Sequence, residues 1–188
     1  MTDVRQAAEQ VGRAGEPCEG CGGLGVAVDG PTHPYMRSSP ECWQAYGELA
    51  ALLHRLPADD AARHHHVDAY AVQHPGQAEQ DRRQRQSVAV HLVSLCLLLE
   101  HGQPPGSAAR RRGRTSATVL PRLGLPDWPY LAPPAGPAAV TAIDVLAVTR
   151  TPDGPLLARA WLETAWAAWQ DHHSAVRSWA QATLEDRS

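Results

Sequence analysis

The sequence predicts an all-α protein, a bundle of about five helices preceded by an irregular N-terminal segment that contains cysteines. Three observations favour this class. Apolar residues recur at helical spacing in several stretches, helix start and stop signals bracket those stretches, and no clear strand pattern is present. The 188 residues suit one domain with a small appendage, and the hydrophobic content of 43% is enough for a core.

The N-terminal 38 residues carry no helix signal. Residues 1–17 are polar, and we predict a flexible leader there. Residues 18–38 are rich in Gly and Pro, which favours irregular structure, and they include the cysteine pair C-E-G-C-G-G at residues 18–23. Helical patterns begin after this loop, so the helical domain is predicted over residues 39–185.

The first helix begins in the stretch S-S-P-E-C-W. Ser39 is a good N-cap, Pro40 suits the first helical position, and Glu41 is favoured by the positive end of the helix dipole. Pro57 ends the helix. The apolar face has 4-3-4-3 spacing and consists of Cys42, Tyr46, Leu49, Leu53 and Leu56.

The second and third helices follow directly. The second is predicted from Asp59 or Asp60 to His74, because the Pro75-Gly76 pair disfavours further helix. The third, residues 78–101, becomes almost wholly apolar in S-V-A-V-H-L-V-S-L-C-L-L-L, which predicts a buried, central helix that ends at Gly102. The shared face of the second helix consists of Arg63, Val67, Tyr70 and His74.

The C-terminal half contains a predicted loop and two more helices. Residues 103–137 are expected to form a long Pro/Arg-rich loop, with the basic run R-R-R-G-R at residues 110–114. A short helix then starts with a capping box formed by Thr141 and Asp144. One continuous helix is predicted over residues 155–184. Its buried stripe consists of Ala158, Leu162, Ala165, Trp169, His172, Val176 and Trp179.

The composition limits the possible environments and partners. The net charge of −3 argues against a nucleic-acid or membrane-surface binder, which is usually basic. The N-terminus has no apolar signal-peptide core, and no run is long enough for a membrane helix, so we expect a cytoplasmic protein. The chain has no Lys, Asn or Phe and is rich in Ala, Arg, Gly and Pro, which indicates a GC-rich bacterial genome.

The cysteines predict a zinc site. Reduced cysteines in the cytoplasm favour metal binding over disulfides, and zinc prefers thiolates and imidazoles in a closed tetrahedron. Cys18 and Cys21 can bind one ion from a tight, knuckle-like turn, and Cys42 follows in the first turn of a helix. The fourth ligand would be a histidine, with His33 as the first choice and His74 as the rival. The alternative interpretation is a loop of reduced, unpaired thiols.

Two other cysteine roles are less well supported. A redox pair of the thioredoxin type lies directly at a helix start, whereas here the helix signals begin only at Ser39. Cys96 lies within the apolar run of the third helix, so we expect it in the core.

The histidines predict an alternative second site inside the bundle. A helical bundle can gather ligands from several helices around one metal ion. The candidate ligands are His64, His91, His172 and His173, and the arrangement resembles DinB-like bundles with a three-histidine metal site. Asp68 and His91 are the candidate catalytic residues. Taken singly, each histidine also has a structural interpretation, as a core residue, a helix-end cation or part of a solvated face.

Two further patterns have mainly structural interpretations. The four tryptophans near the C-terminus are more typical of core packing than of a ligand site. The arginine run at residues 110–114 could contact phosphate, but a solvated loop is the more common role for so short a run.

Four motifs carry a resemblance to a known family. They are D-G-P-T-H-P-Y-M-R-S-S-P-E-C-W, V-D-A-Y-A-V-Q-H-P-G, Q-S-V-A-V-H-L and W-A-A-W-Q-D-H-H-S-A-V-R-S-W. Together they resemble an uncharacterised bacterial family, domain of unknown function 5946, over roughly residues 18–180. The arginine-rich insertion departs from it. The resemblance implies no activity. It implies motif positions at Cys18, Cys21, His33, Cys42, Asp68, Gln73, His74, Gln86, His91, His172 and His173.

Two functions are therefore compatible with the residues. The first is a cytoplasmic, zinc-binding helical protein with a structural metal site and an interaction or regulatory role towards a protein partner. The second is a metal-dependent enzyme, a hydrolase or transferase, with the histidine-rich site inside the bundle. Nucleic-acid binding through the basic loop ranks last.

Overall fold

The computed structural model describes residues 15–76, 78–79 and 81–185, so most of the predicted leader lies outside the described residues. The all-α class is confirmed, since these residues form eight α-helices, one 3-10 helix and no β-strand, although about five helices were predicted. The elements are α2 (Pro40–Leu53), α3 (Ala61–Gln73), α4 (Arg82–Leu99), α5 (Pro105–Arg112), α6 (Thr115–Arg122), α7 (Ala142–Val148), α8 (Gly154–Ala167), η1 (Gln170–His172) and α9 (His173–Leu184).

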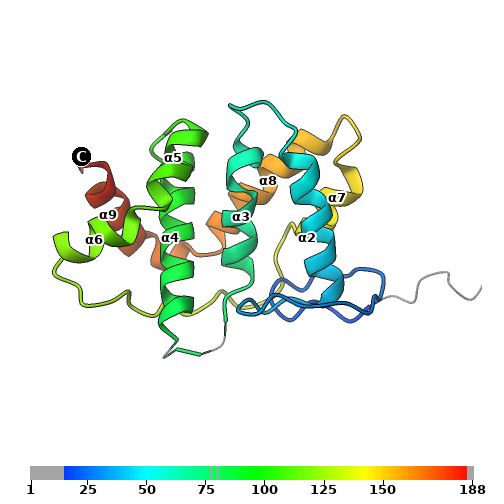
Figure 1. Cartoon of the computed structure of the whole chain (residues 1–188), viewed down its shortest axis with the longest axis horizontal. Helices are drawn as coiled ribbons and strands as arrows, with labels where there is room; N and C mark the ends of the chain where they lie inside the picture. Colours follow the sequence, from blue (N-terminus) through cyan, green and yellow to red (C-terminus); the bar gives the residue numbers. More distant parts are fainter. Residues whose placement is uncertain (1–14, 77, 80, 186–188) are drawn as a thin grey trace, which may run out of the picture.

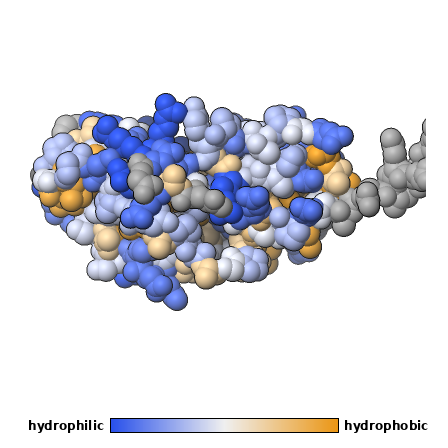
Figure 2. Space-filling model, turned by 90° about the horizontal axis from the view of Figure 1, so that it is seen from below, coloured by the Kyte–Doolittle hydropathy of each residue, from blue (hydrophilic) through white to orange (hydrophobic). Residues whose placement is uncertain are grey.

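The helices stand side by side along the long axis of the molecule, with α6 and α9 at one end and α2 and α7 at the other (Figure 1). The main packing pairs are α3 with α4 and α8, α2 with α7, and α4 with α5 and α9. The N-terminal segment crosses one end of α2 and α3 as an irregular loop. Seen from below, the surface is mainly hydrophilic, and hydrophobic side chains reach it mostly towards the two ends (Figure 2).

Helix α2 begins as the sequence predicts. The Ser39 side chain accepts a hydrogen bond from the Cys42 amide, and Pro40 occupies the first turn. The buried residues of α2 are Cys42, Tyr46, Leu49 and Leu53, as expected from their spacing, but the helix ends at Leu53 before Pro57, so Leu56 lies outside it and is only half-buried. This face packs on α7 and α3, so α2 carries Cys42 towards the interior.

Helix α3 buries more than the predicted face. Asp60 caps it and His74 follows its last residue, as expected. Because α3 packs against α2, α4, α5 and α8, polar residues are buried on several sides, and Val67 is only half-buried. His65, His66 and Asp68 are fully or almost fully buried, which the periodicity did not predict.

Helix α4 is the central helix, as predicted from its apolar run. It packs against five other helices, and Leu92, Leu95 and Cys96 are completely buried. Asp81 caps the helix through the Arg83 amide, so α4 starts at Arg82, four residues later than expected. In the described part of the chain, neither α4 nor any other helix is both long and apolar enough to cross a membrane.

The prediction of a loop over residues 103–137 is wrong for the first half of this range, because α5 and α6 lie there. Arginine is a good helix former, and Pro105 occupies the first turn of α5. The basic run forms the last turn of α5, and two of its arginines make hydrogen bonds within the protein. Arg111 donates to the Thr183 carbonyl at 3.0 Å, and Arg112 donates to the Asp68 carboxylate. Trp128, 1% exposed, anchors the remaining loop.

The last predicted helix is interrupted. Helix α7 starts with the expected capping box of Thr141 and Asp144, but α8 ends at Ala167 and α9 begins at His173. At the break, the Trp169 indole turns inward and donates to the Val72 carbonyl at 3.2 Å. This break lets α8 pack on α3 while α9 packs on α4, which one straight helix could not do.

Truncating the core of α4 should destabilise the fold strongly. We expect Leu92→Ala to lower the free energy of unfolding by about 2–5 kcal/mol, because a completely buried leucine leaves a cavity. Leu156→Ala is the matched control, since Leu156 is 73% exposed, and it should change stability by less than about 0.5 kcal/mol. Urea denaturation measures both, and equal effects would contradict the assignment of α4 to the core.

Candidate metal centre

Residues 18–23, the cysteine turn, form a compact knuckle. The Gly22 amide donates to the Cys18 carbonyl at 2.7 Å, and the Cys18 amide donates to the Gly23 carbonyl at 2.9 Å. Gly22 has a φ of +74°, which favours glycine at this position. The Gly23 amide lies 3.4 Å from Cys21 Sγ and the Ser39 amide 3.4 Å from Cys18 Sγ, so backbone N–H groups face both sulfurs.

Two helix ends bring the other donors to this turn. Cys42 lies in the first turn of α2, where the helix dipole favours a thiolate. His74 directly follows α3. Its Nδ1–H donates to the Tyr70 carbonyl at 2.7 Å, and its ring stacks on Tyr70 with centroids 3.9 Å apart. This hydrogen bond selects the tautomer in which Nε2 is free to bind a metal ion.

The four donor atoms form a buried cluster with metal-ligand geometry. The Sγ atoms of Cys18, Cys21 and Cys42 and Nε2 of His74 all lie within 4.8 Å of one another. Cys21 Sγ and Cys42 Sγ are 3.7 Å apart, and Cys42 Sγ is 3.3 Å from Nε2. A tetrahedral zinc site with bonds of about 2.3 Å to sulfur has sulfur–sulfur edges of about 3.8 Å, so the cluster fits such an ion.

Electrostatics also favour a cation at this position. Hydrogen bonds from Cys21 and Cys42 hold the pKa of the Cys18 thiol far below its usual range. Hydrogen bonding to Cys18 and Cys21, together with burial, raises the pKa of Cys42. Burial alone would lower the pKa of His74, but its hydrogen bonds to Cys18 and Cys21 raise it to about 9. The Cys18 and Cys42 thiols thus differ in how readily they ionise, and a bound cation would favour the thiolate form of both.

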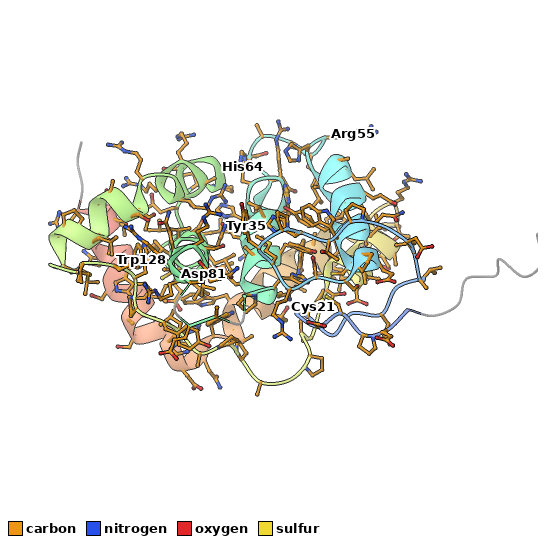
Figure 3. The ribbon with its side chains drawn as sticks, turned by 60° about the horizontal axis from the view of Figure 1, so that its bottom comes forward. Cys21, Tyr35, Arg55, His64, Asp81 and Trp128 are labelled. Atoms are coloured by element: carbon orange, nitrogen blue, oxygen red, sulfur yellow. The ribbon has the colours of Figure 1, made fainter. Side chains whose placement is uncertain are left out.

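Gly20 lets the turn approach α3. A Cβ atom at this position would lie 2.6 Å from His74 Cδ2 and 3.0 Å from the Gln73 carbonyl oxygen, and it would also collide with the Arg37 carbonyl. Figure 3 shows Cys21 on the N-terminal segment where it runs past the ends of α2 and α3. Only a glycine leaves room for the turn to lie directly against the histidine ring.

The structure brings His74, and not His33, to the cysteines. His33 Nδ1 accepts hydrogen bonds from the Tyr35 and Met36 amides, each at 3.1 Å, and its ring lies edge-on to Trp43. His33 thus stabilises the loop that leads into α2. Sequence spacing alone could not separate the two histidines, because either could close a Cys₃His set.

The proposed second set of histidines does not come together. His64 Nε2 donates to the Ala58 carbonyl at 2.7 Å and His172 Nε2 to the Ala132 carbonyl at 2.9 Å. His173 stacks on Trp166 with centroids 3.8 Å apart. Within the described ranges, the Cys₃His cluster is the only group of three or more Cys, His, Asp or Glu donors close enough to share an ion.

Asp68 and His91, the candidate catalytic pair, do meet. The Asp68 carboxylate is completely buried in α3 and accepts four hydrogen bonds. Burial would raise its pKa, but hydrogen bonds from two histidines and the nearby Arg112 charge hold the pKa well below its usual range. The four donors are His65 Nδ1 at 2.7 Å, His91 Nδ1 at 2.6 Å, Arg112 at 2.8 Å and Ser94 Oγ at 2.9 Å. We call Asp68 and these four residues the Asp68 network.

Sequence reasoning missed five residues around these groups. Gly20 and Tyr70 support the cysteine cluster. Gly20 lies between the two cysteines of the turn, and Tyr70 shares the predicted face of the second helix with His74, but neither was assigned a role. Ser94 and Arg112 belong to the Asp68 network, but Ser94 lies in an apolar run and Arg112 in a stretch interpreted as a loop. A usable signal was present for His65, which lies three residues before Asp68 and therefore on the same helical face.

The comparisons with known proteins give one match. A family described as "Family of unknown function (DUF5946)" matches residues 16–170, a range that includes the cysteine cluster and the Asp68 network. Neither the curated proteins nor the solved structures gave a match.

Gly20 and Gly47 offer a matched test of the close approach between the turn and α3. Gly20→Ala should destabilise the protein by about 2 kcal/mol or more, because the turn must move away from His74. Gly47→Ala, in α2 with nothing within 4 Å of the new methyl group, should stabilise it by about 0.5–1 kcal/mol. Thermal unfolding measures both, and a neutral Gly20→Ala would contradict the packing described.

His66 should make stability depend on pH. Burial, as the largest cause, lowers its pKa from 6.5 to about 4. The unfolded chain therefore binds a proton that the folded chain does not, and stability is lost as pH falls from 6.5 to 4. We expect the stability difference between wild type and His66→Gln to shrink over this range by roughly 2 kcal/mol.

The measurement is urea denaturation at several pH values. Contributions from other groups, the cysteine cluster included, cancel in the difference between the two proteins. His101→Gln, at an exposed histidine, is the control and should leave the pH profile parallel to that of wild type. A parallel profile for His66→Gln would show that His66 does not titrate as described.

Proposed function

This chain belongs to the family of unknown function DUF5946, and we propose that it is a zinc-binding protein whose metal ion fastens an interaction loop to a helical bundle. The observation that supports this proposal is the buried Cys₃His cluster. Thiolate and imidazole donors in a tetrahedron suit zinc better than magnesium or calcium, which prefer oxygen ligands.

The site suits a structural role. Four protein donors complete a tetrahedron, so the set leaves no position for a substrate or an activated water. The donors come from three segments: the cysteine turn, the start of α2 and the end of α3. Since these segments meet only in the folded chain, the free energy of zinc binding would contribute directly to folding.

The loop after the cysteine turn suits a protein contact. The side chains of Leu24 and Val26 are 61% and 59% exposed. The backbone beside them is nevertheless held in place, because Gly23 and Gly25 lie close to the side chains of Ile143 and Glu41. Hydrophobic side chains also reach the surface at the end of the molecule that carries α2 and α7 (Figure 2). A loop held by zinc would present such side chains to a partner with little loss of conformational entropy.

A metal-dependent enzyme with a histidine site in the bundle is less well supported. His64, His172 and His173 each bond to a different backbone carbonyl, and His91 bonds to Asp68. An ion shared by these side chains would require rearrangement of several helices.

The decisive measurement is metal content by elemental mass spectrometry on untagged protein. We expect about one zinc per chain in the wild type, and its loss in Cys21→Ser and His74→Gln. Cys96→Ser and His33→Gln are matched controls, because they change the same residue types outside the cluster, and both should retain the metal. Zinc lost from the controls but kept in Cys21→Ser would reject the assignment.

Chelation tests the structural role separately. Removing zinc should abolish the cooperative unfolding transition or lower its midpoint, because the cysteine turn then loses its attachment to α2 and α3. A melting curve unchanged by chelator, in protein that had contained zinc, would leave a metal site without a structural role.

A further inference from the structure

The Asp68 network contains a histidine that the proposed zinc site does not use. Asp68 is completely buried, and each of its carboxylate oxygens accepts two hydrogen bonds. His65, also completely buried, contacts Asp68 through Nδ1 and the Pro105 carbonyl through Nε2 at 3.0 Å, so both of its nitrogens face acceptors. Both nitrogens of His65 are therefore engaged by protein groups, which makes His65 a structural clamp.

His91 has the opposite arrangement. Its Nδ1–H donates to Asp68 Oδ1 at 2.6 Å, and its side chain is 14% exposed, unlike that of His65. In the part of the chain that the structure describes, no group hydrogen-bonds to Nε2 of His91. A buried carboxylate that holds one imidazole nitrogen and leaves the other free is the arrangement of a general base.

A cation lies next to this imidazole. Arg112 donates to the same Asp68 oxygen as His91, at 2.8 Å, and its side chain is 24% exposed. Only one of the five guanidinium N–H donors is needed for this contact. Arg112 therefore places a positive charge on the same carboxylate oxygen that accepts from His91.

The exposed side of His91 opens into a shallow cleft of about 450 Å³ along the first three turns of α4. Arg82 and Arg83 lie at its far end, and Gln86 and Ser87 lie between them and His91. Arg83 packs its guanidinium over Tyr35, 4.9 Å from the ring centroid, which fixes its position. Because Arg82 also pairs with Asp127 at 3.4 Å, Arg83 is the main cation at this end, and together with the imidazole at the other end it suits a small anion.

We propose that Nε2 of His91 is the proton acceptor of an acid–base site that opens into this cleft and takes a small organic anion, with Asp68 as the positioning residue. The site is separate from the cysteine cluster and does not depend on the proposed zinc function. In the reaction, Nε2 takes a proton from water while the water oxygen forms a bond to the carbonyl carbon of an ester in the bound anion. The carbon–oxygen bond to the ester's alkoxide then breaks, and the proton passes from Nε2 to that leaving oxygen. Nδ1–H stays bonded to the ionised Asp68 throughout, so the products are an acid and an alcohol and the site ends unchanged.

The first test uses diethyl pyrocarbonate, an electrophile that acylates unprotonated imidazole nitrogens, with peptide mass spectrometry to give a rate for each histidine. His54 is an internal control, because its Nδ1 donates to the Ala50 carbonyl at 2.8 Å and its Nε2 is exposed. Asp68 accepts from Nδ1 of His91 as the Ala50 carbonyl does from His54, so Nε2 is the reactive nitrogen in both, and His91 should be acylated within about threefold of the rate of His54 although it is less exposed. A rate more than about tenfold below that of His54 overturns the base assignment.

The second test uses inorganic phosphate as the anion probe, against sodium chloride at equal ionic strength. Phosphate should slow acylation of His91 by about threefold or more and leave His54 unaffected, because the arginines raise the local anion concentration. Arg83→Gln should remove this protection, whereas Arg159→Gln, at an exposed pair on α8, should keep it. Protection that is absent, or that survives Arg83→Gln, overturns the anion site.

Nitrogen NMR of the wild-type protein checks the positioning role of Asp68 without a variant that could unfold. Neutral His91 should carry its proton on Nδ1, the minor tautomer of free imidazole, because Asp68 accepts from that atom. Observation of the Nε2–H tautomer would overturn the orientation on which the proposal rests.

Discussion

The convergence of three sulfur atoms and one imidazole nitrogen is the constraint on which the N-terminal half of the structure depends. Buried thiols and a buried imidazole at these distances compete for charge, and the geometry that relieves this competition is that of a tetrahedral cation site. The surrounding backbone holds these four donor atoms together. Gly22 adopts the positive φ that closes the turn, Gly20 leaves room for the histidine ring, and the Tyr70 carbonyl orients His74.

Helix α3 links this cluster to the rest of the bundle. Its C-terminal end supplies His74, and its middle supplies Asp68, whose carboxylate joins α3 to α4 and α5. Such a buried ionised group is costly unless all its acceptors are satisfied, and here each oxygen has two donors. The buried polar side chains of α3 therefore help to specify which helices pack against it and in which register. The apolar contacts of α4 contribute to the same packing.

Tryptophan side chains connect the C-terminal helices to the same framework. Trp161 donates to Gln73 Oε1 at 2.9 Å, and Trp169 donates to the Val72 carbonyl, both at the end of α3 that precedes His74. Gln73 in turn donates to the Val140 carbonyl at 2.8 Å. Helix α8 and the loop before α7 thus hold the same end of α3 that positions His74, and the Cys₃His cluster is supported from both sides.

The sequence by itself determined the features that depend on near neighbours in the chain. The start of α2 at Ser39, the capping box of Thr141 and the burial of Cys96 follow from caps and apolar runs, which act within a few residues. Only the tertiary structure decided which histidine joins the cysteines, where the last helix breaks, and that Arg112 meets Asp68. These outcomes depend on distances between elements far apart in sequence, which local propensity does not encode.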